Sequence, residues 1–316
     1  MISVFLLFWI ASAFMIVCER SVIRIIIYSG IYSLISAACF LVLAAPDVAM
    51  AEAVISAFST IFYIICLEKY YGLGADANDM LRSRNGNGDA GGRVDVLKNI
   101  LLPAGFTLLL FALFVYFVPD ASVTPLLKNQ YIAQFVQDVG GENTVTAIYL
   151  GYRVYDTLFE ALMLLVSVVA VAHLSWYSDV EASDGSRSLI NRSEIAVPTI
   201  RIVVPVLILF GIYLIMNGHL SPGGGFQGGV VVAAFYICRY MIYDIYDVKI
   251  GRFMTVEKCI FIGIVTVATV MVFLGIKIQT GFPREIYLIV MNALIGFKVA
   301  CGFTMIFYRY IVFERK

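Results

Sequence analysis

Long apolar runs separated by short polar connections are the main pattern of this chain. Nine such runs recur from one end to the other, and each is about as long as a helix that crosses a hydrocarbon core of roughly 30 Å. Their approximate bounds are 2–18, 22–44, 48–67, 100–118, 157–176, 200–216, 228–243, 257–276 and 285–308. We therefore predict an all-α fold, a polytopic membrane helix bundle with about nine transmembrane helices.

The basic residues predict how this bundle is oriented. Of the 22 Lys and Arg residues, 17 fall in alternate connections on one side of the predicted membrane and four on the other, while Lys298 lies within the last run. Cytoplasmic connections normally carry the excess of positive charge. We therefore expect the N-terminus outside and the C-terminus in the cytoplasm. The first run has no basic flank before it, and Glu19 and Arg20 follow it, so we expect a retained helix rather than a cleaved signal.

Composition limits the chemistry that this chain can perform. It is 61% hydrophobic and 14% charged, which is too little charge for a sizeable soluble domain in 316 residues. The six cysteines form no Cys-x-x-Cys pair, and two histidines alone give no ligand cluster, so we expect no metal site. The sequence also shows no Ser/His/Asp set and no cofactor loop. We expect no catalytic site and no cofactor in this chain, and no nucleic-acid partner.

Two polar cytoplasmic stretches divide the chain into three segments. Residues 71–99 are rich in Gly, Asn and Asp and lack helical periodicity, which is typical of a flexible linker, and residues 178–197 form a second linker. The predicted segments are therefore 1–70 with three helices, 100–177 with two, and 198–316 with four.

The connection over residues 119–155 is the largest feature on the predicted outer side. Five apolar residues follow a near-helical spacing within it: Leu126, Leu127, Ile132, Phe135 and Val136. This pattern favours a short amphipathic helix on the membrane face, and an ordinary connector is the alternative.

A glycine-rich stretch, Asn217–Gly229 (NGHLSPGGGFQGG), connects two of the predicted helices. Its glycines near the end are Gly223, Gly224, Gly225, Gly228 and Gly229. A loop so poor in side chains can approach the membrane edge only where protein covers its backbone. No Gly-Lys-Ser/Thr follows, so it is not a phosphate loop. The stretch closely resembles the signature of the B subunit of the multisubunit, Mrp-type Na⁺/H⁺ antiporter, a family whose modules also occur in membrane-bound hydrogenases.

The other segments extend this resemblance. Ala45–Ala53 (APDVAMAEA) resembles a three-helix piece near the end of the antiporter A subunit, a piece that is a separate chain in hydrogenase complexes. Gly140–Ile148 (GGENTVTAI) and Tyr155–Glu160 (YDTLFE) resemble the two-helix piece that follows it. The resemblance implies other antiporter-type membrane subunits as partners, with hydrogenase-type iron–sulfur subunits in some complexes. It also implies transport of Na⁺ and H⁺, contact with lipid, and a place in the plasma membrane of a prokaryote.

Carboxylates inside the predicted helices are the sharpest chemical signal. An ionised group at mid-bilayer costs about 3 kcal/mol or more, so it normally faces protein or water. Glu52 lies five residues beyond Asp47, and Glu160 four beyond Asp156, so the two glutamates are predicted at similar depths, about 8 Å from the outer face. Neighbouring carboxylates can share a proton or bind a cation. The alternative is that each glutamate is tied structurally to a hydroxyl, amide or backbone group.

The remaining charged candidates are Asp47, Asp156 and Lys298. The two aspartates lie near the predicted interface, where we expect them to cap the helices that follow. Lys298 lies thirteen residues past Glu285, roughly 20 Å along the last predicted helix, which is too deep for its amine to reach the outer face easily. A buried lysine suits a proton relay, or it locks a carboxylate in a static ion pair. Both interpretations stay open.

The two histidines are weaker candidates. His219 lies in the glycine-rich stretch on the predicted outer side, where it can sense external pH. His173 lies near the cytoplasmic end of its helix, where packing or solvation is the usual role of such a residue.

These observations lead to one preferred hypothesis about function. The resemblance implies a non-catalytic membrane subunit of an Mrp-type cation/proton translocating complex, either a stand-alone Na⁺/H⁺ antiporter or the ion-translocating module of a hydrogenase-type, ferredoxin-linked respiratory complex. The alternative is a structural scaffold that joins other subunits without its own ion path. A self-sufficient transporter ranks last, because paired repeats with matching broken helices are not evident.

Overall fold

The computed structural model describes residues 2–19, 21–71, 126–174, 196–242, 250–275 and 284–311, and the single residues 105, 108, 109 and 112. All regular secondary structure in these ranges is helical. Apart from these four single residues, the predicted run at 100–118 lies outside the described residues, and so do nearly all of the two predicted linkers.

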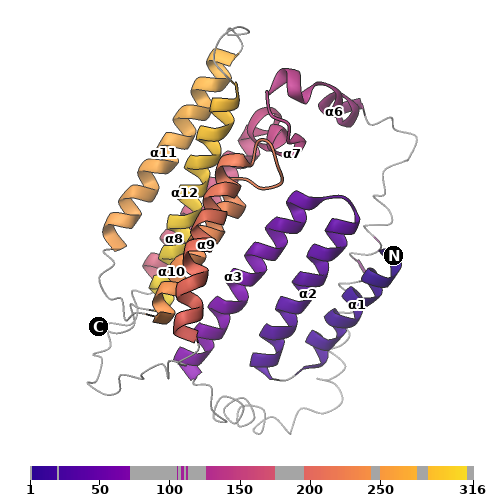
Figure 1. Ribbon diagram of the computed structural model, residues 1–316, viewed down its shortest axis with the longest axis vertical. Coiled ribbons are helices and arrows are strands. Elements are labelled where there is room, and N and C mark those ends of the chain that lie inside the picture. Colours follow the sequence, from indigo (N-terminus) through magenta and orange to yellow (C-terminus); the bar gives the residue numbers. More distant parts are fainter. Residues whose placement is uncertain are drawn as a thin grey trace. The chain divides into compact units, whose positions relative to one another are not determined.

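Eight long helices and three short ones make up the described chain (Figure 1). The long helices are α1 (Ile2–Cys18), α2 (Val22–Val42), α3 (Pro46–Tyr71), α8 (Val154–Leu174), α9 (Ala196–Asn217), α10 (Gly225–Ile242), α11 (Ile250–Gly275) and α12 (Arg284–Ile311). The short ones are α6 (Leu126–Asp138), α7 (Thr144–Ala147) and the π-helical turn η1 (Ile148–Tyr152).

Six of these helices are long and apolar enough to cross a membrane: α2, α3, α8, α9, α11 and α12. The apolar helix α1 is shorter. Eight of the nine predicted runs therefore lie on helices, and the prediction of an all-helical, multi-pass membrane protein is confirmed. The total of nine spans and the predicted orientation stay predictions.

The chain divides into two compact units. The first unit contains Met1–Lys69 and Tyr131–Lys316, and it holds every long helix apart from the last two residues of α3. The second unit is Tyr70–Gln130, of which the structure describes the end of α3, the four single residues and the start of α6.

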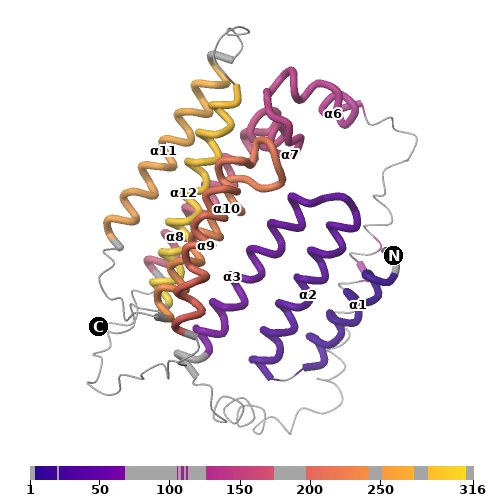
Figure 2. The backbone as a smooth tube through the Cα atoms, in the orientation of Figure 1, coloured from indigo at the N-terminus to yellow at the C-terminus, as the bar shows by residue number. Residues whose placement is uncertain are grey.

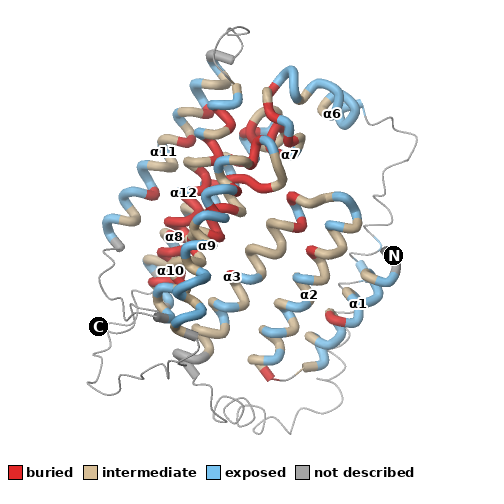
Figure 3. Tube along the Cα trace, viewed as in Figure 1, coloured by how far each residue is buried: buried red, intermediate tan, exposed pale blue. Residues whose placement is uncertain are grey.

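Helix α12 is the centre of the first unit's core. It packs against α8, α9, α10 and α11, and most of its apolar stretch is buried. Figure 3 shows buried residues gathered along α10, α12 and the loops at their ends, whereas α1, α2 and α3 are mostly half-buried or exposed. Glycines let the helices approach closely: a Cβ on Gly229 of α10 would lie 2.5 Å from the carbonyl oxygen of Gly296 on α12.

Aromatic contacts join the first three helices to the rest of this unit. Trp9 of α1 stacks on Tyr32 of α2 with ring centroids 5.1 Å apart, and Phe58 of α3 meets Phe303 of α12 edge-on at 5.0 Å. Phe58 is also the one described residue of α3 that is buried in the main apolar cluster. Ser33 of α2 donates a hydrogen bond to Glu52 of α3, so α3 connects α2, and α1 through α2, to the core.

The predicted helix in the outer connection is present as α6. Leu126, Leu127, Ile132 and Val136 are exposed, and Phe135 packs against the main apolar cluster. The ring of Tyr131 stacks on that of Tyr152 at 4.4 Å. The helical pattern is therefore confirmed, while its place on a membrane face stays a prediction.

Candidate ion-path sites

A buried polar network closes the predicted outer end of the first unit. Asp47, in the first turn of α3, accepts hydrogen bonds from Asn143 Nδ2 (2.9 Å) and from the backbone N–H of Gly223 (3.1 Å). The same Asn143 nitrogen lies 3.1 Å from the carbonyl oxygen of Gly218 and 3.0 Å from that of Ser221. One asparagine thus joins the start of α3, the start of α7 and the loop between α9 and α10.

Asn143 also caps α7. Its Oδ1 accepts from the backbone N–H groups of Val145 (2.9 Å) and Thr146 (3.4 Å), which satisfies two free donors of a helix start. Asp47 was expected to cap α3. It is instead the second residue of that helix, and its hydrogen bonds connect α3 to other segments.

Asn292 of α12 continues the network from the other side of the loop. Its Oδ1 accepts from Tyr149 Oη (2.9 Å) and from the backbone N–H of Gly225 (3.1 Å). Thr146 Oγ1 donates to the carbonyl oxygen of Gly218 at 2.6 Å. Burial raises the pKa of Tyr149 to about 12, so its hydroxyl keeps its proton as a hydrogen-bond donor at physiological pH.

The loop between α9 and α10 (Figure 2) contains glycines whose geometry fits this network. Gly223 has φ 151° and Gly224 has φ 147°, backbone conformations that favour glycine. A Cβ on Gly224 would lie 2.5 Å from Tyr149 Oη, and one on Gly225 would collide with the carbonyl oxygen of Asn292. The loop ends at Gly225, where α10 begins, so Gly228 and Gly229 belong to that helix and pack against α9 and α12.

His219 is buried inside this loop. Its carbonyl oxygen accepts from the backbone N–H groups of Glu142 (3.0 Å) and Asn143 (2.9 Å). Its Nδ1 has no hydrogen-bond partner among the described residues. The backbone of His219 is therefore structural, and its imidazole, 5% exposed as a residue, has little access to external water.

Glu52 lies in a hydroxyl-lined groove, by which we mean the cavity bounded by Ser29, Ser33, Glu52, Ser56, Ser59 and Thr60 together with Ile26, Ile55 and Tyr63. The cavity volume is about 170 Å³. Ser33 Oγ of α2 donates a hydrogen bond to Glu52 Oε1 of α3. No ion pair to Glu52 is formed by the residues that the structure describes.

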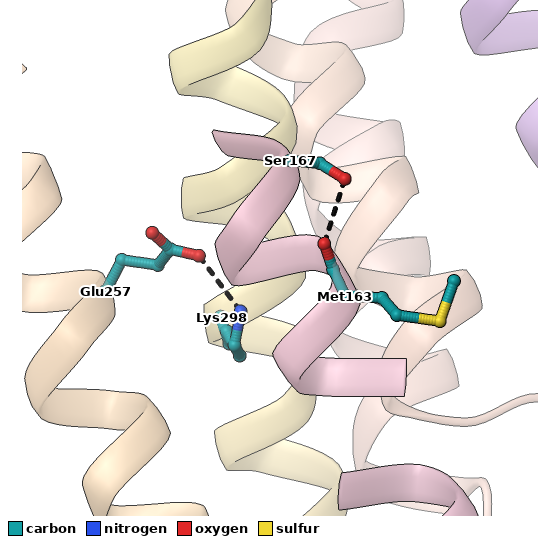
Figure 4. A network of polar contacts seen from close by, with 4 residues as sticks. All are labelled: Met163, Ser167, Glu257 and Lys298. Atoms are coloured by element: carbon teal, nitrogen blue, oxygen red, sulfur yellow. Dashed lines mark hydrogen bonds and ion pairs between the residues drawn. The ribbon is translucent and has the colours of Figure 1, made fainter. Parts of the chain in front are cut away.

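The second membrane-embedded charge is neutralised inside the protein. Lys298 of α12 lies 2.9 Å from Glu257 Oε1 of α11, and both side chains are only 1% exposed (Figure 4). The ammonium group also lies 5.8 Å from the centre of the Phe261 ring. The sequence left two roles open for Lys298, a proton relay or an ion pair with a carboxylate. The structure identifies Glu257 as a carboxylate partner within this chain. We call Lys298 and Glu257 the sealed pair.

The other candidates do not gather at one place. Glu160 is on the surface of α8 and shares no hydrogen bond or ion pair with Glu52 among the contacts of the described residues. Asp156 forms an exposed ion pair with Arg153 at 2.5 Å, and His173 is exposed in the last turn of α8. The expected meeting of Glu52 and Glu160 is not seen within this chain.

Sequence reasoning missed Glu257, Asn143 and Asn292. Glu257 was the first residue of a predicted span and so was expected at the membrane edge. Helix α11 begins seven residues earlier, at Ile250, so Glu257 lies inside the bundle. The asparagines give no periodic signal, because their role comes from contacts across 67 to 143 positions of sequence. The signal that could have found Asn143 is its position inside the Gly140–Ile148 stretch (GGENTVTAI), which carries part of the resemblance.

Two protein families match this chain. Residues 195–313 match a domain related to the MnhB subunit of the Na⁺/H⁺ antiporter, and residues 7–71 match MbhD, the D subunit of MBH. The first match contains the glycine-rich loop and the sealed pair, and the second contains Asp47 and the hydroxyl-lined groove.

Curated relatives match separate parts of the chain. A putative antiporter subunit mnhB2 of Staphylococcus haemolyticus is 33% identical over 78 residues, 24% of this chain and 55% of that protein. A putative antiporter subunit mnhA2 of the same organism is 23% identical over 165 residues, 52% of this chain and 19% of that protein. The chain spans about half the length of the first curated relatives that it matches.

Two solved structures share the fold. A chain in the structure of an Mrp complex from a Dietzia species superposes with a TM-score of 0.67 at 18% identity, over 98% of this chain and 34% of that one. A chain of the membrane-bound sulfane sulfur reductase, an archaeal respiratory membrane complex, superposes with a TM-score of 0.52 at 24% identity, over 70% of this chain and 97% of that one. This chain thus carries an MnhB-related domain after an MbhD domain, and it is similar to subunits of Mrp-type antiporters, with parts similar to the antiporter's MnhA chain.

Proposed function

We propose that this chain is a non-catalytic membrane subunit of a complex that exchanges cations for protons, and that its sealed pair is part of the charge-moving path. The family matches support the kind of complex. The single observation that carries the path is the pair itself, a lysine and a glutamate in contact at 2.9 Å within helices of membrane-crossing length.

A buried ion pair costs free energy inside a membrane protein. Removing two charges from water costs several kcal/mol per ion, and apolar residues of similar volume often stabilise a protein as well or better. A lysine and a glutamate, however, can exchange one proton between them and become a neutral pair, which apolar residues cannot do. A charge that arrives in a neighbouring subunit therefore biases the pair between two states, and this coupling is the step that we assign to it.

The parent machine has two candidate forms. Relatives named as antiporter subunits support a stand-alone Na⁺/H⁺ antiporter, whereas MbhD and the sulfane sulfur reductase support a redox-driven respiratory complex. In either form we propose a prokaryotic plasma membrane location and antiporter-type partner subunits, with iron–sulfur subunits in the redox-driven form. Purification of the native complex, followed by identification of its subunits, separates the two forms.

A structural scaffold is the second candidate function. The observation in its favour is the buried network of Asp47, Asn143 and Asn292, which holds three segments together without moving an ion. Under this alternative the sealed pair is a static lock.

A neutral double variant distinguishes the two. Glu257→Gln/Lys298→Gln removes both charges while two amides can still hydrogen bond, so the complex is expected to assemble. If the pair moves charge, Na⁺-driven proton movement in everted vesicles carrying the whole complex falls below about a tenth of wild type, since general proton-transfer groups contribute a hundredfold or more. If the pair is a lock, exchange stays near wild type, which contradicts the proposal.

The matched control is Lys258→Gln. Lys258 is adjacent to Glu257 in sequence but is exposed, so its removal takes away a nearby lysine and leaves the contact between Glu257 and Lys298 in place. Exchange and the amount of assembled complex are both expected to stay at the wild-type level in this variant.

A further inference from the structure

The hydroxyl-lined groove is made by two polar stripes on helices that are otherwise apolar. On α3, Glu52, Ser56, Ser59 and Tyr63 recur at helical spacing and so lie on one face. From Glu52 to Tyr63 this stripe runs about 16 Å, roughly half of a hydrocarbon core. The facing stripe on α2, Ser29 and Ser33, completes the polar lining.

Where the structure shows their bonds, the hydroxyl protons of this groove are donated to acceptors of the protein itself. Ser59 Oγ donates to the carbonyl oxygen of Ile55 at 2.5 Å, and Ser33 Oγ donates to Glu52. A hydroxyl that has donated its proton still has oxygen lone pairs available. The groove therefore presents oxygen lone pairs next to a carboxylate, and the described residues provide no ammonium or guanidinium group to neutralise it.

This composition suits a metal cation better than a proton alone. A proton needs one carboxylate, and surrounding hydroxyl oxygens add little to its binding. A hard monovalent cation needs several oxygen ligands to replace its water, and carboxylate and hydroxyl oxygens are of that kind. The volume of about 170 Å³ also exceeds the roughly 30 Å³ share of one water, so an ion with remaining waters fits.

We propose that the hydroxyl-lined groove binds one Na⁺ ion through the Glu52 carboxylate and the hydroxyl oxygens of Ser33 and Ser56. This inference rests on the proposed function and adds the ion, its ligands and its place. Protonated Glu52 exchanges its proton for Na⁺ at one carboxylate, so one positive charge enters as one leaves and the site stays neutral. Competition of Na⁺ and H⁺ for one carboxylate couples their movements.

Serine variants test the ligands without removing the carboxylate. Ser56→Ala and Ser33→Ala are expected to raise the Na⁺ concentration for half-maximal exchange by about five- to tenfold, the loss of roughly one polar contact. Ser56→Thr keeps an oxygen at the same place and is expected to stay within about twofold of wild type. Exchange is measured in everted vesicles that carry the whole complex.

Ser167→Ala is the matched control. Ser167 lies on α8 outside the groove, and its hydroxyl donates to the carbonyl oxygen of Met163 at 2.8 Å, the same local bond that Ser59 makes (Figure 4). Its loss is expected to leave the Na⁺ dependence unchanged. A direct measurement accompanies the assay: binding of ²²Na⁺ to the purified complex, which is expected to weaken in Ser56→Ala and disappear in Glu52→Gln.

The outcomes separate this inference from the proposed function. In one outcome the serine variants exchange with wild-type Na⁺ dependence, while Glu52→Gln and the neutral Glu257/Lys298 double variant are inactive. Glu52 then handles protons only, so the proposed Na⁺ site is wrong, but the proposed role in cation/proton exchange stands. If the neutral double variant retains exchange while the serine variants shift the Na⁺ dependence, the Na⁺ site stands and the assigned role of the sealed pair is wrong.

Discussion

The helix pairs α11–α12 and α2–α3, which we call the two halves below, hold a buried charge in opposite ways. Between α11 and α12, Lys298 and Glu257 neutralise each other at 1% exposure in a tightly packed bundle. Between α2 and α3, Glu52 is half-buried, bonded to a serine hydroxyl, and lines an open cavity. The first arrangement shields two opposite charges from water, and the second leaves one carboxylate beside an open cavity.

The difference follows from packing. Glycines on α9, α10 and α12 bring these three helices into backbone contact, and α11 packs on α12 beside them. Lys298 and Glu257 are therefore only 1% exposed, where an unpaired charge is very costly. Helices α2 and α3 approach each other at Gly30, where an added Cβ would lie 2.8 Å from Thr60 Oγ1, but they leave a cavity along the serine stripe. We expect the same kind of substitution to act on stability in one half and on ion dependence in the other.

Removing one partner of the sealed pair should have the largest effect. Lys298→Met leaves Glu257 buried without a counter-charge, which costs about 3–5 kcal/mol. The expected result is a large loss of assembled complex, measured by its amount in membranes and its thermal stability in detergent. Glu52→Gln, in the open groove, should leave assembly near wild type. Equal losses of assembly in both variants would remove the contrast between the halves.

Overpacking the glycine loop should come next. Gly225→Ala drives a Cβ into a backbone carbonyl oxygen that cannot move freely, so we expect a loss of about 1–3 kcal/mol, seen as a lower melting temperature. Gly263→Ala on α11 is the control, because an added Cβ there meets nothing within 4 Å. That variant should be neutral or slightly stabilising, since alanine favours a helix.

The sequence alone did not predict most of the contrast between the sealed pair and the hydroxyl-lined groove. The apolar runs predicted eight of the described helices because period and length are local properties, and they also placed Glu52 within a membrane span. The pairing of Lys298 with Glu257 was not predictable, since it depends on how two helices rotate against each other. The sequence likewise predicted Glu52 and Glu160 only at similar depths, and the structure shows that Glu52 accepts a hydrogen bond from a serine of α2. The three-segment division stays a prediction.

The buried network should respond to loss of its central amide. Asn143→Ala leaves Asp47 and the carbonyl oxygens of Gly218 and Ser221 without their shared donor, which we expect to cost about 1–3 kcal/mol. The check is the melting temperature of the purified complex. Asn143 also connects α3 to the loop between α9 and α10, so limited proteolysis should cut the variant more readily than wild type. An unchanged cleavage pattern would contradict that connecting role.

The network should also show a defined pH dependence. Burial raises the pKa of Tyr149 from 10.0 to about 12 in the folded protein, so folding favours its protonated form. This contribution is fully present below pH 10 and is lost as the pH rises through about 12. We therefore expect part of the alkaline loss of stability to be absent in Tyr149→Phe, measured by thermal melting between those two pH values. The same curve in both proteins would contradict the assignment.

The smallest effect is expected for Asp156, the candidate that the structure leaves at the surface. Its ion pair with Arg153 has both side chains more than half exposed, and such pairs contribute about 0.5 kcal/mol or less. Asp156→Asn should therefore leave the melting temperature almost unchanged, and any loss of exchange in this variant reports on transport alone. Neither the sealed pair nor the hydroxyl-lined groove requires Asp156, so wild-type exchange is expected. A variant that melts normally but exchanges poorly would mean that a partner protein covers this carboxylate and that the ion path includes the surface of α8.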